Sequence, residues 1–294
     1  MNYNNGQWVA GVLRIRGSVI PNILGRVLFC SLIGFVVALV HYLHPPGVKL
    51  YYPSFATISP GLVLSLLLVF RTNTAYERFW EGRKIWGAIT NTGRSLARQI
   101  WVSVETRTEE EYQEKIEVLR LISAFALAIK LGLRKQSLDE LETLVSPEKM
   151  AVLRTAQNPP LEITVWIDAY VHRQHRKGQL DSNQLAIIST LLNQEIDNCG
   201  ACDRILQTPM PFAYSIHLRQ LVMIYCLMIP FQVVKDLGFL TAFATGFISF
   251  TLLGIEEIGL EIENPFGTDP NDLPLDRICE SMQRNIEDLI ALNP

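Results

Sequence analysis

The chain is short of charge and has no excess of basic residues. Charged side chains make up 19% of its 294 residues, and 26 Lys and Arg against 29 Asp and Glu give a formal net charge of −3. Nucleic-acid-binding domains carry clustered positive charge, so we expect no nucleic-acid partner. The sequence also lacks a nucleophile–base constellation, a phosphate-binding loop and a dinucleotide fingerprint, which argues against an enzyme.

Cysteine is sparse and odd in number, with 5 residues in the chain. An odd count without a secreted framework does not predict disulfides. Cys30 and Cys226 lie in apolar stretches, where a thiol behaves as a small hydrophobe. The first residues lack the apolar core and cleavage site of a signal peptide, so we expect none. No segment alternates apolar and polar residues as a half-buried strand does, which predicts an all-α protein.

The chain does have long apolar runs, and 49% of its residues are hydrophobic. The runs are long enough to cross a bilayer core of about 30 Å. They predict four transmembrane helices, at about 23–43, 53–76, 211–234 and 237–256. We expect the whole chain, residues 1–294, to form a single domain. Charge and helical periodicity predict that the segments at about 77–208 and 261–294 are cytosolic. The second of these segments is expected to be helical from Asp276 to Leu292.

Basic residues indicate which side of the membrane these segments occupy. The first two predicted spans are joined by a loop whose only basic residue of the Lys or Arg type is Lys49. Their other ends are flanked by Arg14, Arg16, Arg26, Arg71, Arg78, Arg83 and Lys84. The positive-inside rule then places both termini and the large middle segment in the cytosol.

The stretch Ser59–Lys84 joins the second apolar run to a segment dense in charged and aromatic side chains. Leu62, Leu66 and Phe70 recur every four residues and therefore share one helix face. Their spacing leaves open whether that face packs against other helices or lines a constriction. The basic residues that follow could attract anions or pair with acidic neighbours. We favour pairing, because Glu81 lies three residues from basic partners on either side.

Three separated segments resemble the bestrophin family, in particular its bacterial and plant-chloroplast branch. They are FRTNTAYERFWEGRKIWG (70–87), TPMPFAYSIHLR (208–219) and EIENPFGTDPNDLPLD (261–276). The resemblance covers nearly the whole chain and implies a homopentameric ion channel. Five copies of the second span would line the pore, and the cytosolic helices would enclose a vestibule. It also implies a multi-pass protein of a bacterial inner membrane, or of a thylakoid-type membrane in a photosynthetic host.

The family majority implies that the permeating ions are chloride and other monovalent anions. A sodium- or potassium-selective channel of the same fold is the alternative. The family's hydrophobic neck maps onto Leu62, Leu66 and Phe70, as stacked apolar rings that gate by dewetting. Edges of the Phe70 ring towards the pore would favour anions, and ring faces would favour cations. A second, cytosolic constriction maps near Ala186 or Ile187, on a predicted helix at Ser182–Leu206.

The calcium clasp of animal relatives maps onto four residues with oxygen ligands, which suit a hard cation. They are Glu261, Asn264, Asp269 and Asp272. Pro270 and Asn271 interrupt the acidic run, and the bacterial branch of the family is not calcium-dependent. We therefore expect no required cofactor and leave Ca²⁺ binding open. The alternative is a structural role, in which the prolines of this segment enforce turns.

Two short patterns point to other chemistry. Cys199 and Cys202 have CxxC spacing, and a membrane redox or metal protein using this pair is the remote alternative function. Such a role needs a lowered thiol pKa or a second ligand pair, and the chain has no second CxxC. His172 and His175 could share a helix face as a metal pair, but their basic surroundings favour a solvated cluster.

Overall fold

The structure, a computed structural model, describes residues 14–15, 17–43 and 55–292, with the backbone alone for residues 55–59. Helices and no strand occur among these residues, which confirms the all-α prediction. The α-helices are α2 (Ile20–Leu43), α3 (Phe55–Ser103), α4 (Glu109–Arg134), α5 (Pro147–Thr155), α6 (Pro159–Arg176), α7 (Ser182–Gln207), α8 (Phe212–Leu237), α9 (Thr241–Glu261) and α10 (Leu275–Leu292). Two 3₁₀ turns are η1 (Asp139–Thr143) and η2 (Gly238–Leu240). The chain divides into two units, each taken by itself below.

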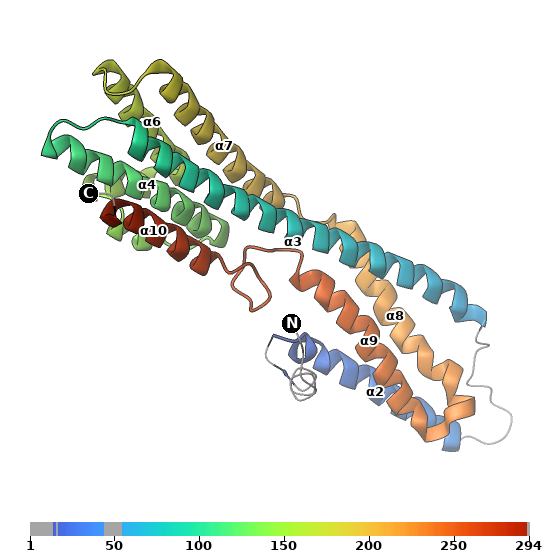
Figure 1. Cartoon of the computed structure of the whole chain (residues 1–294). Coiled ribbons are helices and arrows are strands. Elements are labelled where there is room, and N and C mark those ends of the chain that lie inside the picture. The colour runs from blue at the N-terminus through green and yellow to red at the C-terminus, as the bar shows by residue number, and fades with distance from the viewer. Residues whose placement is uncertain (1–13, 16, 44–54, 293–294) are drawn as a thin grey trace. The chain divides into compact units, whose positions relative to one another are not determined.

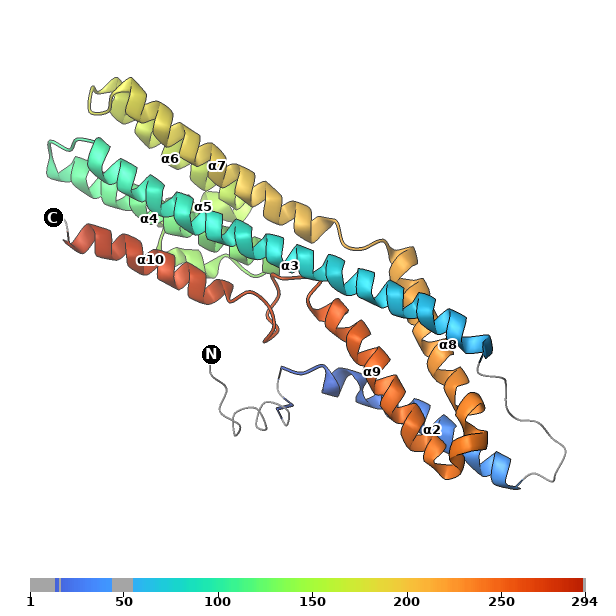
Figure 2. The same cartoon turned by 45° about the vertical axis from the view of Figure 1, so that its right-hand side comes forward.

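The first unit contains α2, α8, α9 and the part of α3 up to Phe79. Figures 1 and 2 show α2 lying along α9, with α8 beside them and joined to α9 through η2. Gly238 makes the turn into η2 with φ of +52°, a backbone conformation that favours glycine. All four helices contribute to one apolar core, which consists of Ile23, Cys30, Leu64, Leu68, Leu218, Val222, Cys226 and Leu253.

Small residues allow α2 and α9 to approach closely. A Cβ added to Gly34 would lie 2.9 Å from Thr245 Oγ1 and 3.2 Å from Ala242 Cα. A Cβ added to Gly246 would lie 3.3 Å from the side chain of Ser31. Helices within lipid gain little from apolar burial alone and associate through such close packing. The long α2–α9 interface therefore depends on glycine at these two positions.

Two segments of the described chain are long and apolar enough to cross a membrane, Ile20–Leu43 and Phe212–Glu261. The first is α2, and the second comprises α8, η2 and α9. Three of the four predicted spans fall on these segments. The remaining one, 53–76, begins outside the described residues and continues into α3, which runs unbroken for 49 residues.

The second unit contains the later part of α3, together with α4, α5, α6, α7 and α10. Thr108 caps the N-terminus of helix α4, and its side chain accepts a hydrogen bond from the N–H of Glu111 at 3.2 Å. This cap satisfies a backbone donor that has no partner within the helix. Helices α6, α7 and α10 all pack against α4, and α4 is buried along most of its length. It therefore forms the centre of this unit.

The segment between α9 and α10 is not helical. Residues 265–272 form turns and bends, and α10 starts at Leu275, one residue before the predicted start at Asp276. Pro265, Pro270 and Pro274 each lack a backbone donor and restrict the chain locally, which excludes a continuous helix here. The N–H of Leu273 donates to the carbonyl of Pro265 at 2.9 Å, so this loop closes on itself.

Candidate functional site

One face of α3 carries apolar side chains that stay exposed on the single chain. Leu62, Leu66 and Phe70 are 69%, 55% and 56% exposed. The intervening Leu64 and Leu68 are each 2% exposed and belong to the apolar core of the first unit. The helix therefore packs through one side and presents the predicted neck face outwards. An apolar stripe of this kind needs a further partner, which is lipid, another subunit or a pore.

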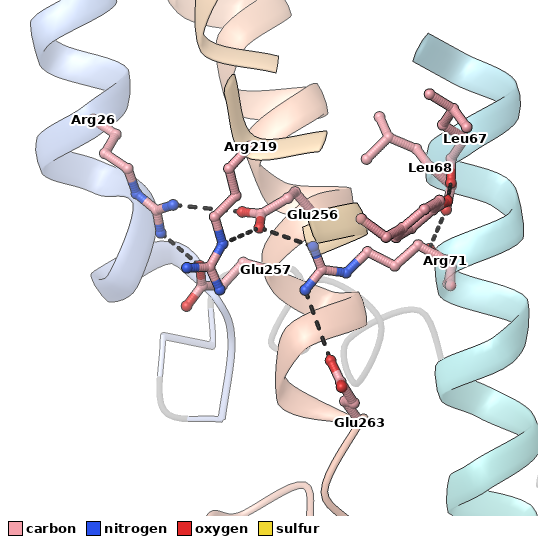
Figure 3. A network of polar contacts seen from close by, with 10 residues as sticks. Arg26, Leu67, Leu68, Arg71, Arg219, Glu256, Glu257 and Glu263 are labelled. Carbon is pink, nitrogen blue, oxygen red and sulfur yellow. Dashed lines mark hydrogen bonds and ion pairs between the residues drawn. The ribbon is translucent and has the colours of Figure 1, made fainter. Parts of the chain in front are cut away.

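A buried arginine follows the exposed face directly. Arg71 is 1% exposed, and its Nη1 lies 3.3 Å from Glu256 Oε1 on α9. Its Nη2 lies 3.8 Å from Glu263 Oε2, just beyond α9 (Figure 3). An unpaired guanidinium at this depth would cost several kcal/mol, so the two carboxylates are a structural requirement.

Glu256 is the centre of a larger group that we call the ion-pair network. Its carboxylate, 2% exposed, is also 3.5 Å from Arg26 Nη1 on α2 and 3.3 Å from Arg219 Nε on α8. Arg26 Nη2 reaches Glu257 Oε2 at 2.5 Å. The members are Arg26, Arg71, Arg219, Glu256, Glu257 and Glu263, shown in Figure 3. Three positive and three negative charges cancel, and all four helices of the first unit take part.

Hydrogen bonds hold the same region of α3 in register. Tyr214 of α8 donates its hydroxyl to the carbonyl of Leu67 at 2.9 Å. Arg78 Nε donates to the carbonyl of Glu263 at 3.1 Å, and the carboxylate of Glu263 accepts from the N–H of Met210 at 2.9 Å. The contacts of Leu67 and Arg78 are made by α3 itself. They fix the rotation of the helix and therefore the direction in which Phe70 points.

Arg71 is paired, but its partners lie on and after α9 and not along its own helix, where the sequence predicts the pairs of the basic residues. Glu81, for which the sequence predicts basic partners three residues away, forms its ion pair with Arg204 of α7 instead, at 3.2 Å. The acidic members of the network were not predicted as partners of Arg71. A signal was available, since Glu256 and Glu257 end an apolar run, where ionisable groups are costly unless paired.

The predicted constriction residues lie on α7 in the second unit. Ile187 is 49% exposed, Ala186 is also exposed, and the next residue, Ile188, is fully buried. Helix α7 thus packs through Ile188 and presents the two predicted residues outwards. Their role in a constriction stays a prediction.

The predicted calcium residues are engaged in other contacts. Glu261 accepts hydrogen bonds from Asn22 at 3.1 Å and Asn271 at 2.8 Å. The other three, Asn264, Asp269 and Asp272, each have interacting partners as well. Within the described residues, no three His, Cys, Asp or Glu side chains are grouped so that they could hold a metal ion. Calcium binding stays an open prediction.

Cys199 and Cys202, the residues of the alternative redox or metal function, are placed unfavourably for that chemistry. Burial raises the pKa of Cys199 to about 12 and also raises the pKa of Cys202, so both thiols stay protonated at neutral pH. A reactive cysteine needs the opposite shift. His172 Nε2 lies 3.6 Å from Asp168, whereas His175 Nδ1 lies 2.7 Å from the carbonyl of Leu180. The two imidazoles therefore serve different contacts.

A buried carboxyl on α7 was not predicted. Glu195 is 1% exposed, and neither of its oxygens has a hydrogen-bond partner among the described residues. It faces Gly93 of α3, where an added Cβ would lie 3.4 Å from Glu195 Oε1. Burial raises the pKa of Glu195 to about 9, because the charged form loses its hydration. This side chain is therefore neutral at pH 7.

Comparisons with known proteins agree on one family. The family model described as Bacterial/Fungal Bestrophin protein matches residues 2–288. A voltage-dependent anion channel-forming protein of Nostoc is 53% identical over 98% of this chain and 93% of its own length. A protein of the same name in Escherichia coli K12 is 32% identical, over 97% and 91%. A crystal structure of a bacterial bestrophin homolog from Klebsiella pneumoniae has a TM-score of 0.83 and 28% identity, covering 92% of this chain and all of that one.

We expect Glu256→Gln to destabilise the first unit strongly. The change leaves Arg71 buried beside a neutral group, and breaking a buried pair typically costs about 3–5 kcal/mol. Thermal unfolding in detergent, followed by size-exclusion chromatography, measures the loss. Glu257→Gln is the matched control, because Arg26, the partner of Glu257, is 36% exposed and would still form its ion pair with Glu256. Equal losses in the two variants would contradict a network centred on Glu256.

We expect Glu195→Gln to raise stability increasingly with pH. The folded-state pKa of Glu195, about 9, lies above its ordinary value of 4.5, so the wild-type protein loses stability as the pH rises between these values. Glutamine has the same shape and does not ionise. The melting temperatures should converge near the lower pH and diverge towards the higher one. Asp197→Asn, an exposed change on the same helix, should give a curve parallel to wild type, and a parallel curve for Glu195→Gln would contradict the assignment.

Proposed function

The chain belongs to the bacterial and fungal bestrophin family, and we propose that it forms a homopentameric channel that conducts chloride and other monovalent anions. The family is membrane-embedded, and its structures are oligomeric channels. The observation that carries the proposal is the apolar face of α3, which is exposed on the single chain while the opposite side of the helix is packed. In a ring of subunits this face is free to line a central pore.

In such a ring, Leu62, Leu66 and Phe70 would each repeat around the axis and form three stacked apolar belts. A narrow apolar tube disfavours water, and an ion entering it would lose hydration without compensation. The belts would therefore close the pore until the helices separate or the tube rewets. The ion-pair network supports this role, because it fixes the rotation of α3 one residue beyond Phe70.

Anion selectivity is proposed from the names of the relatives, and the structure limits how it could arise. The relatives at 53% and 32% identity are named as anion channel-forming proteins. The arginines nearest the apolar face are matched by three carboxylates, so fixed positive charge is not available there as a filter. Selectivity would then rest on the side chains of the belts themselves, with the positive edges of the Phe70 rings turned towards the pore.

The remaining features of the proposal concern placement and cofactors. We propose that both termini face the cytosol of a bacterial inner membrane, in agreement with the basic residues around the first two spans. A second constriction would form at Ala186 or Ile187, whose exposed positions on α7 suit that role. We propose that Ca²⁺ is not required for opening, since the carboxylate of Glu261 already accepts hydrogen bonds from two asparagines.

We expect the purified protein, reconstituted in a planar bilayer under a KCl gradient, to give a reversal potential near the chloride equilibrium potential. The measurement separates the proposal from its alternative, because the chloride and potassium potentials have opposite signs. A reversal potential near that of potassium would overturn the anion assignment and favour the cation channel. Absence of current in repeated reconstitutions would overturn conduction itself.

We expect Leu66→Ala to raise open probability or conductance roughly twofold or more, because it widens one belt and lowers the cost of wetting. Single-channel recording on the same preparation measures both quantities. Val102→Ala is the matched control, since Val102 is an exposed apolar residue of the same helix that lies 36 residues beyond Leu66 and outside the predicted neck. If the triple change Leu62→Ala, Leu66→Ala and Phe70→Ala left the currents as they are in wild type, the belts would not be the gate.

A further inference from the structure

The second unit contains a cavity that the proposed channel function does not use. Its volume is about 330 Å³, and it lies between α4, η1 with the residue after it, and α10. Helix α4 contributes Ser123, Leu127 and Lys130, which share one face through their spacing of four and three. Helix α10 contributes Asp276, Cys279, Glu280 and Gln283, which share a face in the same way. Two helix faces thus form opposite walls of one site.

One wall of the cavity contains a polar group that makes no hydrogen bond to the described residues. Ser123 is 4% exposed, and its Oγ makes no hydrogen bond within the described residues. A buried hydroxyl in this state loses about 1–3 kcal/mol of hydration, so a ligand that reaches it gains a ready partner. The neighbouring wall is apolar, since Leu127, Leu144 and Cys279 are each at most 9% exposed.

The solvent-exposed part of the cavity lining, which we call its mouth, is acidic, because Glu140, Asp276 and Glu280 are all exposed. Lys130 is its one basic lining residue, and its Nζ is already paired with Glu140 at 2.7 Å and Asp276 at 3.0 Å. Asp276 is also paired with Arg134, at 2.8 Å. The third lining carboxylate, on Glu280, takes part in none of the ion pairs among the described residues. Three carboxylates therefore stand against two cations, Lys130 and Arg134, and the one negative charge in excess favours a positively charged ligand.

We propose that this cavity is a binding site for a small organic ammonium compound with an apolar body and a hydroxyl group. The ammonium lies at the mouth beside Glu280, Glu140 and Asp276. The apolar body lies against Leu127, Leu144 and Cys279, and the hydroxyl hydrogen-bonds Ser123. An anionic ligand is disfavoured, because it would compete with two carboxylates for Lys130 and would face Glu280 without compensation.

Isothermal titration of the purified full-length protein with tyramine tests the site independently of conduction. Tyrosol carries a hydroxyl in place of the tyramine ammonium, and 4-hydroxyphenylacetate carries a carboxylate. Tyramine should bind more tightly than tyrosol, and the carboxylate should bind least. Glu280→Gln should weaken tyramine roughly three- to fivefold, as expected for a partly exposed charge pair. Ser123→Ala should weaken it roughly three- to tenfold through the lost hydrogen bond.

Asp288→Asn is the matched control, because Asp288 is an exposed carboxylate of α10 outside the cavity, and it should leave tyramine binding unchanged. Size-exclusion chromatography confirms that each variant keeps the wild-type elution volume. Absence of tyramine binding at millimolar concentration would overturn the proposal. So would equal binding of the three compounds, or wild-type affinity in both Glu280→Gln and Ser123→Ala.

Discussion

The buried guanidinium of Arg71 is the constraint on which the rest of the first unit depends. It follows Phe70 directly, is 1% exposed and has its two carboxylates on or just after α9. Because an isolated charge at that depth would cost several kcal/mol, α3 cannot turn or slide against α9 without breaking the pairs. The pairs therefore determine that the side of α3 with Leu64 and Leu68 is buried in the core. The side with Leu62 and Leu66 is left exposed.

Charged and apolar side chains have different roles in this arrangement. The ion-pair network joins all four helices of the first unit and carries no net charge. The exposed face beside it carries no charge at all along Leu62, Leu66 and Phe70. In the proposed channel, the arginines would therefore position the helix, and the apolar belts would gate and select. A net positive network would instead have argued for an electrostatic funnel at the same place.

The second unit shows which features sequence patterns predict and which depend on helix packing. Helical periodicity predicts α7, and its core-facing residues include Ile188 and Leu192. The next turn on the same face is Glu195, so the pattern contained a signal that this carboxyl is buried. Its neutral state and its contact with Gly93 could not be predicted, because both depend on how closely α3 and α7 approach. Ser123 and Lys130 are similar, since only the packing of α10 on α4 encloses them in one cavity.

The sequence by itself determined the all-α class, the positions of the apolar segments, the shared face of Leu62, Leu66 and Phe70, and the family. These follow from local periodicity and from motifs read along the chain, for which no distant contact is needed. Only the tertiary structure decided which carboxylates receive Arg71, because Glu256 is 185 residues away along the chain. It also decided that the predicted neck face is exposed and not packed. The physical reason is the same in both cases. Burial and ion pairing between helices arise only when the helices pack together, so neither can be assigned from one segment of sequence.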